Sequence, residues 1–482
     1  MSDFEAVQSR ERGSPVATEP ARVMGFADLV LFYVVTGISL RWIATAAAAG
    51  PSAVVIWVIA WFCFYTPLAL SVLELSSRYP EEGGLYVWTK HAFGGFSGYM
   101  AGWAYWTSNL PYFPAVLYFA ASNALFIGGG RWASLAGNAH FYMWFSVIAL
   151  ALITLMNLIG LNVGKWLHNV GAFGMWVPAA IVIVMGFYAW HRFGSATSFT
   201  VSTMIPRTQW KDMGLWATLM FAFGGCETAS FIAGEIKNPR RTMPRALLAA
   251  GILVTFCYIC GTIGVLLALP ANQVNDLQGL MQAISATAGK VGWYGIVPVA
   301  AALIALSNLG SSGAYLAATA RLPFVAGLDH FLPEAFGRLH PRWGTPYVAL
   351  ILQAAIGMLF VFLAQAGTSV KGAYDVLVSM GIITYFVPYL YLFASMFKLQ
   401  REPAGPEVIS VPGGKVIAKL VACLGFATTV VTIALSLLPP PDEPNKILAV
   451  AKIVLLSGFL LGVGAVFYVA KQSQNARLRT PR

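Results

Sequence analysis

The chain has 482 residues, of which 58% are hydrophobic and only 10% are charged, and its mean hydropathy is +0.70. A soluble globular protein carries about 25% charged residues, so this composition excludes an ordinary soluble domain and predicts a protein of the lipid bilayer. The formal net charge is +11, but the basic residues are dispersed between apolar runs rather than clustered with aromatic side chains, which argues against nucleic-acid binding.

Apolar runs long enough to cross a bilayer recur along the whole chain. A membrane-spanning helix needs about 20 mostly apolar residues. We predict twelve such spans, near residues 26–48, 52–78, 96–125, 141–163, 168–190, 213–235, 246–269, 291–322, 346–366, 374–398, 415–437 and 447–470.

The spans divide the chain into four expected parts. The polar segment before the first span has no apolar core followed by a small-residue cleavage site, so it is not expected to be a cleaved signal peptide. We expect a cytoplasmic N-terminal tail over 1–24, a ten-helix core over 25–400, two further helices over 401–470 and a cytoplasmic C-terminal tail over 471–482.

Lys and Arg accumulate in alternate connections between the predicted spans. With the N-terminus placed inside, 20 of the 30 Lys and Arg residues fall on the inner side and 7 on the outer side. Arg41, Lys419 and Lys452 fall within spans. Because cytoplasmic loops carry an excess of Lys and Arg, the asymmetry predicts a multi-pass protein of the cell (inner or plasma) membrane with both termini in the cytoplasm.

Two of the spans contain residues that interrupt a helix. The first is interrupted at Thr36-Gly37-Ile38-Ser39, and the sixth at Gly224-Gly225. A glycine costs a helix interior about 1 kcal/mol relative to alanine, and irregular backbone within a bilayer must be buried in protein or line a cavity. Because the two breaks lie five spans apart, we predict two inverted repeats, over about 25–190 and 213–398, with a binding site between the breaks.

An interrupted helix leaves peptide groups without helical partners. The half-helix after the break presents the positive end of its dipole, which attracts a carboxylate. The half-helix before the break ends in carbonyl groups, which accept hydrogen bonds from an ammonium group. Two breaks that face each other therefore favour a zwitterion such as an α-amino acid, bound by the backbone of Gly37, Ile38, Ser39, Gly224 and Gly225.

Two ionisable side chains follow the breaks. Glu227 lies two residues past Gly225, and Arg41 lies four residues past Gly37. A charge at membrane depth is costly and indicates a functional residue by default. Glu227 would sense protons, pair with a cationic substrate or hold the broken helix together. Arg41 would pair with Glu227 or bind an acidic substrate, and we favour the internal pair.

Aromatic and polar side chains of spans 3 and 6 complete the candidate substrate site. Trp106 and Asn109 lie in the run GWAYWTSNLPYF, and Phe221 and Phe223 precede the second break. Such side chains line a cavity as an aromatic gate, or they pack in the interior of the protein.

Span 8 contains a candidate ion site. Ser311 and Ser312 would either allow close helix packing or supply oxygens to Na⁺. The sequence contains no nucleotide-binding loop of the G-x-x-x-x-G-K-S/T type, no H-E-x-x-H and no cluster of His and Cys. It therefore predicts no enzyme, no cofactor and no resident metal.

The stretch FAFGGCETASFIAGEIKNPRRTMPRAL, residues 221–247, resembles the sixth-span signature of the amino acid–polyamine–organocation (APC) permeases. Three further pieces are similar to that family in the same order: Glu74–Trp88, Asn157–Asn169 and Ser311–Pro346. The resemblance covers most of residues 25–400.

The resemblance implies an all-α membrane fold of the leucine-transporter type, with twelve helices arranged as two inverted five-helix repeats and an appended pair. It implies secondary transport of amino acids or related amines by alternating access. By motif position, Phe221 would be the aromatic gate, and Gly37, Ile38 and Ser39 would bind the substrate carboxylate through their backbone. Glu227 would occupy a position linked to protons in some members.

The family pattern leaves the transport mode open. Its first break usually reads G-S-G, which is Gly37-Ile38-Ser39 here, and Met175 stands near a position where some proton-coupled members have lysine. Symport with H⁺ or Na⁺, amino acid/amine exchange and transport of polyamines or other organic cations are the alternatives. A membrane receptor that binds the same ligand without moving it is a further one.

Overall fold

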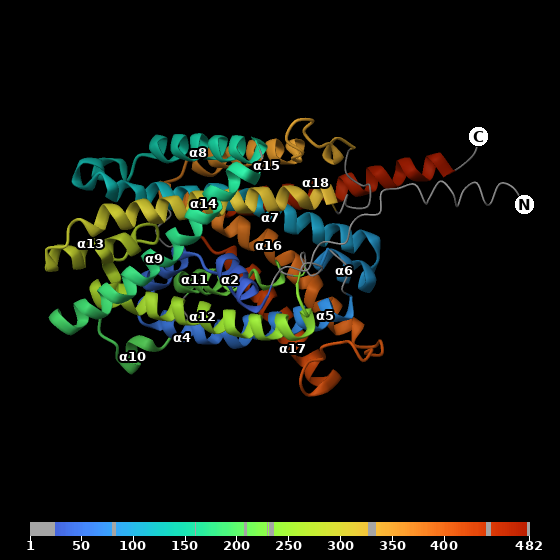
Figure 1. Cartoon of the computed structure of the whole chain (residues 1–482), viewed down its shortest axis with the longest axis horizontal. Coiled ribbons are helices and arrows are strands. Elements are labelled where there is room, and N and C mark those ends of the chain that lie inside the picture. The colour runs from blue at the N-terminus through green and yellow to red at the C-terminus, as the bar shows by residue number, and fades with distance from the viewer. Residues whose placement is uncertain are drawn as a thin grey trace, which may run out of the picture.

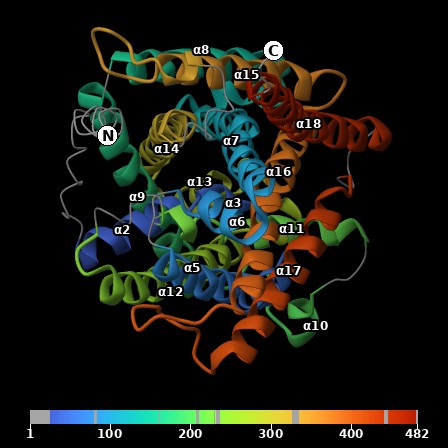
Figure 2. The same ribbon diagram turned by 90° about the vertical axis from the view of Figure 1, so that its right-hand side faces the viewer.

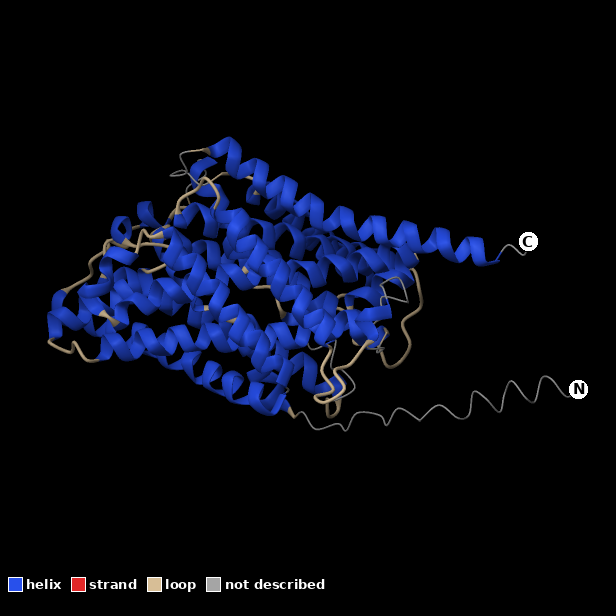
Figure 3. Cartoon of the chain, turned by 90° about the horizontal axis from the view of Figure 1, so that it is seen from above, coloured by secondary structure: helices blue, strands red, loops and turns tan. Residues whose placement is uncertain are grey.

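The computed structural model describes residues 25–79, 83–159, 161–206, 210–228, 230, 236–325, 334–439 and 445–479. Within these residues the regular elements are helices, as Figure 3 shows. The fold class predicted from the sequence, an all-α membrane protein, is confirmed. The predicted N-terminal tail and the end of the sixth span, including Glu235, lie outside the described residues.

The helices of the first half follow one another with short connections. They are α2 (Phe26–Gly37), α3 (Leu40–Ala48), α4 (Ser52–Ala60), η1 (Trp61–Tyr65), α5 (Thr66–Arg78), α6 (Leu85–Phe93), α7 (Gly95–Ala124), η2 (Leu125–Ile127), η3 (Gly129–Leu135), α8 (Ala139–Ile159), α9 (Leu161–Phe193) and α10 (Val201–Met204).

The second half begins with a further short helix before a series of long ones. Its elements are α11 (Trp210–Phe221), α12 (Pro239–Ala268), η5 (Ala271–Gln273), α13 (Gly279–Val291), α14 (Ile296–Val325), η7 (Glu334–Gly337), α15 (Tyr347–Gln365), α16 (Val370–Leu399), α17 (Gly414–Ser436) and α18 (Lys446–Arg479).

Ten helical stretches of the described residues are long and apolar enough to cross a membrane. The other two predicted spans, 26–48 and 213–235, are absent from that set because their described helices are too short to cross a bilayer. The first is divided into α2 and α3, of 12 and 9 residues, and the second contains α11, of 12 residues. Ten continuous helices and two interrupted ones, the first and the sixth, follow the order expected for two inverted repeats and an appended pair.

The long helices run side by side and form two groups (Figure 1). In Figure 2, α8 and α15 lie together along one edge, with α7 and α14 beneath them, while α5, α12 and α17 lie in the opposite half. Helix α9 contacts both α14 and α12, and α16 contacts α7 and α17, so these two helices join the groups. The interrupted helices lie in the centre, where both groups can reach the breaks.

Several shorter helical elements were not predicted from hydropathy, among them α6, α13 and η1. Helix α6 is bounded by Gly84 and Gly94, whose φ angles are 46° and 89°, and α13 ends at Gly292, whose φ angle is 80°. Both are too short to cross a bilayer, so a search for 20-residue apolar runs treats them as loops. The π-helical turn η1 lies inside the second span and carries no signal that apolar periodicity detects.

Glu74, from one of the family-like sequence pieces, anchors the end of α5. Its carboxylate is buried and accepts hydrogen bonds from Arg78 at 2.9 Å and Gln400 at 2.5 Å. The neighbouring Tyr79 donates to Glu402 at 2.5 Å, and burial together with this hydrogen bond raises the pKa of Tyr79 to about 12. These contacts fix α5 to the residues that follow α16.

Candidate functional site

The two helix breaks face each other across a single tyrosine oxygen. Helix α2 ends at Gly37 and α3 begins at Leu40, while Ser39 is extended, with φ −133° and ψ 124°. The hydroxyl of Tyr258, on α12, accepts from the Ser39 N–H at 3.1 Å. The same oxygen lies 2.8 Å from the carbonyl oxygen of Gly37 and 3.2 Å from that of Ala222. Peptide groups of both breaks therefore meet at Tyr258.

The second break depends on two glycines for two different reasons. Helix α11 ends at Phe221, and residues 222–225 are not helical. Gly225 has a φ angle of +112°, a conformation that residues with a Cβ atom rarely adopt. A Cβ atom on Gly224 would lie 2.6 Å from the Tyr385 ring, so this glycine allows α16 to approach the backbone. The second break is therefore encoded by its own sequence.

The Glu227 carboxylate accepts hydrogen bonds from residues around the second break. Its side chain is fully buried, and one carboxylate oxygen accepts from Tyr385 at 2.6 Å and Tyr105 at 3.2 Å. The other oxygen accepts from Tyr389 at 2.7 Å and from the Gly225 N–H at 3.2 Å. Four donors thus converge on one carboxylate, which connects the broken helix to α7 and α16.

Arg41 does not form the internal ion pair with Glu227 that we favoured from the sequence. Its guanidinium carbon lies 4.0 Å from the centre of the Trp42 ring and 5.1 Å from that of Tyr112. Arg41 is only 3% exposed, and its Nε atom has no hydrogen-bond partner in the part of the chain that the structure describes. Among the described residues no carboxylate lies within ion-pair distance of it. The pair fails to form because three tyrosines and a peptide N–H already satisfy Glu227.

A small cavity of about 70 Å³ lies between the breaks. Of the residues predicted for the site, it is lined by Gly37, Ile38, Ser39, Arg41, Asn109, Phe221, Gly224 and Ser311. Further lining residues are Trp42, Ser108, Tyr112, Ala222, Tyr315 and Tyr385. We call this space the central cavity.

The structure places other predicted site residues outside the lining of the central cavity. Trp106 packs against Trp103 and Phe336, with ring centres 5.1 and 6.2 Å apart, because it faces away from the breaks on α7. Phe223 packs edge-on against Trp57 at 5.5 Å, on the far side of the second break. Both are interior packing residues in this conformation.

The remaining predicted residues lie near the central cavity but do not line it. The Gly225 N–H donates a hydrogen bond to the Glu227 carboxylate, and neither residue lines the cavity. Of the candidate ion-site residues, Ser311 lines the cavity and lies 3.2 Å from the Tyr112 hydroxyl. Ser312 is fully buried outside the lining, and its hydroxyl has no hydrogen-bond partner among the described residues.

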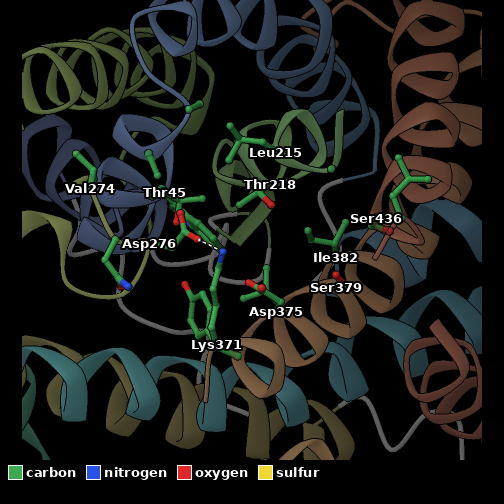
Figure 4. A pocket seen from close by; sticks show the side chains of 18 of the residues that line it. Thr45, Leu215, Thr218, Val274, Asp276, Lys371, Asp375, Ser379, Ile382 and Ser436 are labelled. Atoms are coloured by element: carbon green, nitrogen blue, oxygen red, sulfur yellow. Dashed lines mark ion pairs between the residues drawn. The ribbon is translucent and has the colours of Figure 1, made fainter. Parts of the chain in front are cut away.

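A larger cavity of about 600 Å³, which we call the vestibule, opens at one end of the helix bundle. Its lining includes residues of α3, α11, α16 and the segment 271–276. Figure 4 shows Lys371 and Asp276 on its wall, joined by an ion pair of 3.3 Å, with Asp375 close by. Trp42 lines both cavities, and Phe221 packs edge-on against it at 5.5 Å. These two rings therefore form part of the wall between the vestibule and the central cavity.

Several tyrosines of the site were not singled out from the sequence. Tyr385 and Tyr389 are four residues apart on α16, a spacing that places both on one face of a helix and could have indicated a paired contact. Tyr258 lies between Cys257 and Cys260 in an apolar run, where nothing in the local pattern separates it from a packing residue.

The fold and the site define a class: a multi-pass membrane transporter built around two interrupted helices. The family model described as "Amino acid permease" matches residues 24–464, and the chain belongs to this family, within the APC permeases. The family consists of transporters rather than enzymes, and its substrates are small molecules, namely amino acids or amines.

Curated relatives match most of the chain. An uncharacterized transporter of Legionella pneumophila is 26% identical over 94% of this chain and 97% of its own length. A probable agmatine/putrescine antiporter of Lactococcus lactis is 23% identical over 82% and 84%. A serine/threonine exchanger of Bacillus subtilis is 26% identical over 71% and 74%.

Proposed function

We propose that the protein is a secondary active transporter that moves amino acids or closely related amines by alternating access. The observation that supports this most is the central cavity, which lies between two interrupted helices whose peptide groups meet at Tyr258. Interrupted helices at matching positions of two inverted repeats are a hallmark of transporter substrate sites. The solute would pass from the vestibule to the central cavity past Trp42 and Phe221.

The solute would be held by peptide groups and by a few polar side chains. Ile38 and the groups at Gly37, Ser39 and Gly224 would face it, and Phe221 would act as the gate above it. Tyr258 already binds three of the peptide groups, so we propose that it shapes the site rather than leaving these groups open. We propose that Glu227 positions the second break, because its carboxylate accepts hydrogen bonds from four donors of the protein.

Membrane placement follows from the charge asymmetry of the loops. We propose that both termini lie in the cytoplasm, with residues 25–400 forming the transport core and residues 401–470 the appended pair. In that orientation the segment 271–276, which follows seven spans, lies outside the cell. The vestibule that it lines would then admit solute from the outside.

Exchange is the transport mode to test first. Two of the relatives are named as an antiporter and as an exchanger, and both modes predict counterflow. A polyamine as sole substrate is less well supported, because the described lining of the central cavity contains no carboxylate.

Counterflow into liposomes tests the proposal directly. The purified full chain is reconstituted, the liposomes are loaded with unlabelled amino acids or putrescine, and uptake of the same labelled compound is followed. A transporter accumulates label transiently above the level in protein-free liposomes, and only in loaded liposomes. Saturable binding without accumulation for every compound would instead identify a receptor and overturn the proposal.

A further inference from the structure

The lining of the central cavity carries a positive charge that forms no ion pair with any carboxylate of the described residues. Arg41 is the one charged side chain among the described residues that line it. Glu227 does not line the cavity, because it lies behind Gly224 and is engaged by Tyr105, Tyr385 and Tyr389. The space between the breaks is therefore positively charged.

Arg41 is placed to bind an anion that enters this space. Its side chain is 97% buried, its Nε atom has no hydrogen-bond partner among the residues that the structure describes, and its guanidinium carbon lies 4.0 Å from the Trp42 ring centre. A buried charge without a counter-ion is costly, and stacking on an aromatic ring offsets only part of that cost. A guanidinium group presents donors in a planar fork that matches a carboxylate.

We propose that the transporter selects amino acids with an acidic side chain, of the aspartate or glutamate class, and that Arg41 binds the side-chain carboxylate. This inference rests on the proposed transport function and narrows its substrate. A zwitterion with a neutral side chain would leave the cavity with the uncompensated charge of Arg41. An amino-dicarboxylate carries one net negative charge, so the occupied cavity becomes neutral, whereas a cationic amine would bring a second positive charge into a poorly solvated space.

A second lining residue, Asn109, can supply an acceptor for the ammonium group. The amide nitrogen of Asn109 donates to the carbonyl oxygen of Tyr105 at 3.0 Å, which directs its amide oxygen to act as an acceptor for a solute in the cavity. Arg41 and Asn109 thus offer a donor fork and an acceptor, on α3 and α7 respectively. The volume of about 70 Å³ suits a short solute rather than a long polyamine.

Acid and amide pairs of equal size provide the first test. Labelled aspartate is compared with asparagine, and glutamate with glutamine, in counterflow with the wild-type protein. We expect kcat/KM to be at least tenfold higher for the acid of each pair, and no counterflow of putrescine. If the amides are transported as well as the acids, this inference is overturned while the proposed transport function stands. If no compound accumulates, the transport function itself fails.

Substitution of Arg41 provides the second test. In Arg41→Gln the ratio of acid to amide kcat/KM is expected to fall at least tenfold, and Arg41→Lys is expected to retain part of it. The matched control is Arg192→Gln, which removes an exposed arginine that lies 5.9 Å from the Tyr188 ring, outside both cavities; its ratio should equal that of the wild type.

A folded Arg41→Gln protein with the wild-type ratio would overturn the assignment of Arg41. If Arg41→Gln does not fold, binding to the wild-type protein decides: thermal-shift titration should give a Kd at least tenfold lower for aspartate than for asparagine. Equal Kd values would overturn the inference.

Discussion

The two helix breaks look alike in the sequence but are maintained in different ways. At the second break, Gly225 adopts a φ angle of +112°, and the bare face of Gly224 lies against Tyr385. At the first break, a Cβ atom on Gly37 would make only an ordinary contact, 3.7 Å from a methyl group of Val254. The second break thus needs its glycines, whereas the first does not.

The first break is held instead by a residue that is distant in the sequence. Tyr258, which is 219 residues from Ser39, binds the Ser39 N–H and lies within hydrogen-bond distance of the Gly37 carbonyl. The comparison teaches that a helix can be opened by its own residues or by a side chain that binds its free peptide groups. Substitutions that affect one break and spare the other test this difference.

Replacement of Glu227 by alanine is expected to have the largest effect. The hydroxyls of Tyr105 and Tyr389, which are buried, and of Tyr385, which is partly buried, would lose their carboxylate acceptor at once, and the Gly225 N–H would keep only the Tyr389 hydroxyl, 3.3 Å away. Each unsatisfied buried donor costs about 1–3 kcal/mol before relaxation, so we expect the free energy of unfolding to fall by about 3–5 kcal/mol and counterflow to be lost. Denaturant unfolding of the purified protein in detergent measures the first quantity.

The control is Glu407→Ala, which removes an exposed carboxylate together with its surface interaction and should change stability by less than about 1 kcal/mol. Glu227→Gln keeps one acceptor oxygen but directs an NH₂ group toward donors, so it should fall between the two. Equal stability of Glu227→Ala and Glu407→Ala would show that the carboxylate does not hold the second break.

Gly224→Ala is expected to have the next largest effect. The new Cβ atom would lie 2.6 Å from the ring of Tyr385, and that ring cannot move freely because its hydroxyl is bound to Glu227. Overpacking of this kind costs about 1–3 kcal/mol. Gly37→Ala is the matched control, with an expected change of less than about 0.5 kcal/mol because its Cβ atom meets no overlap. Similar losses in both proteins would contradict the comparison between the breaks.

The sequence predicted the parts of the site that depend on local signals. Hydropathy located the ten described helices that are long and apolar enough to cross a membrane, and Gly224-Gly225 located the second break, because each signal lies within one stretch of the chain. The family signature pointed to Phe221 and Glu227 in the same stretch. The sequence could not show, however, that α2 ends at Gly37 although a larger residue would fit at that position.

The rest of the site depends on contacts between distant segments. The Tyr385–Glu227 hydrogen bond joins residues 158 apart, and no local pattern encodes it. Pairing of Arg41 with Glu227 was reasonable from charge alone, since two opposite buried charges lower each other's cost. The ion pair does not form, because tyrosines of α7 and α16 donate hydrogen bonds to the Glu227 carboxylate instead.

Tyr258→Phe is expected to have the smallest effect on stability and a larger one on transport. The phenyl ring would keep its stacking on Trp57, with ring centres 4.5 Å apart, so only the hydroxyl is lost. The peptide groups of the first break would lose a shared partner, at about 1–2 kcal/mol. Because that oxygen also contacts Ala222, both breaks would shift together, and counterflow should fall at least tenfold. Tyr294→Phe, which removes an exposed hydroxyl, is the control. If the two variants match in both stability and counterflow, Tyr258 does not hold the first break, and the sequence of α2 and α3 must open that helix unaided.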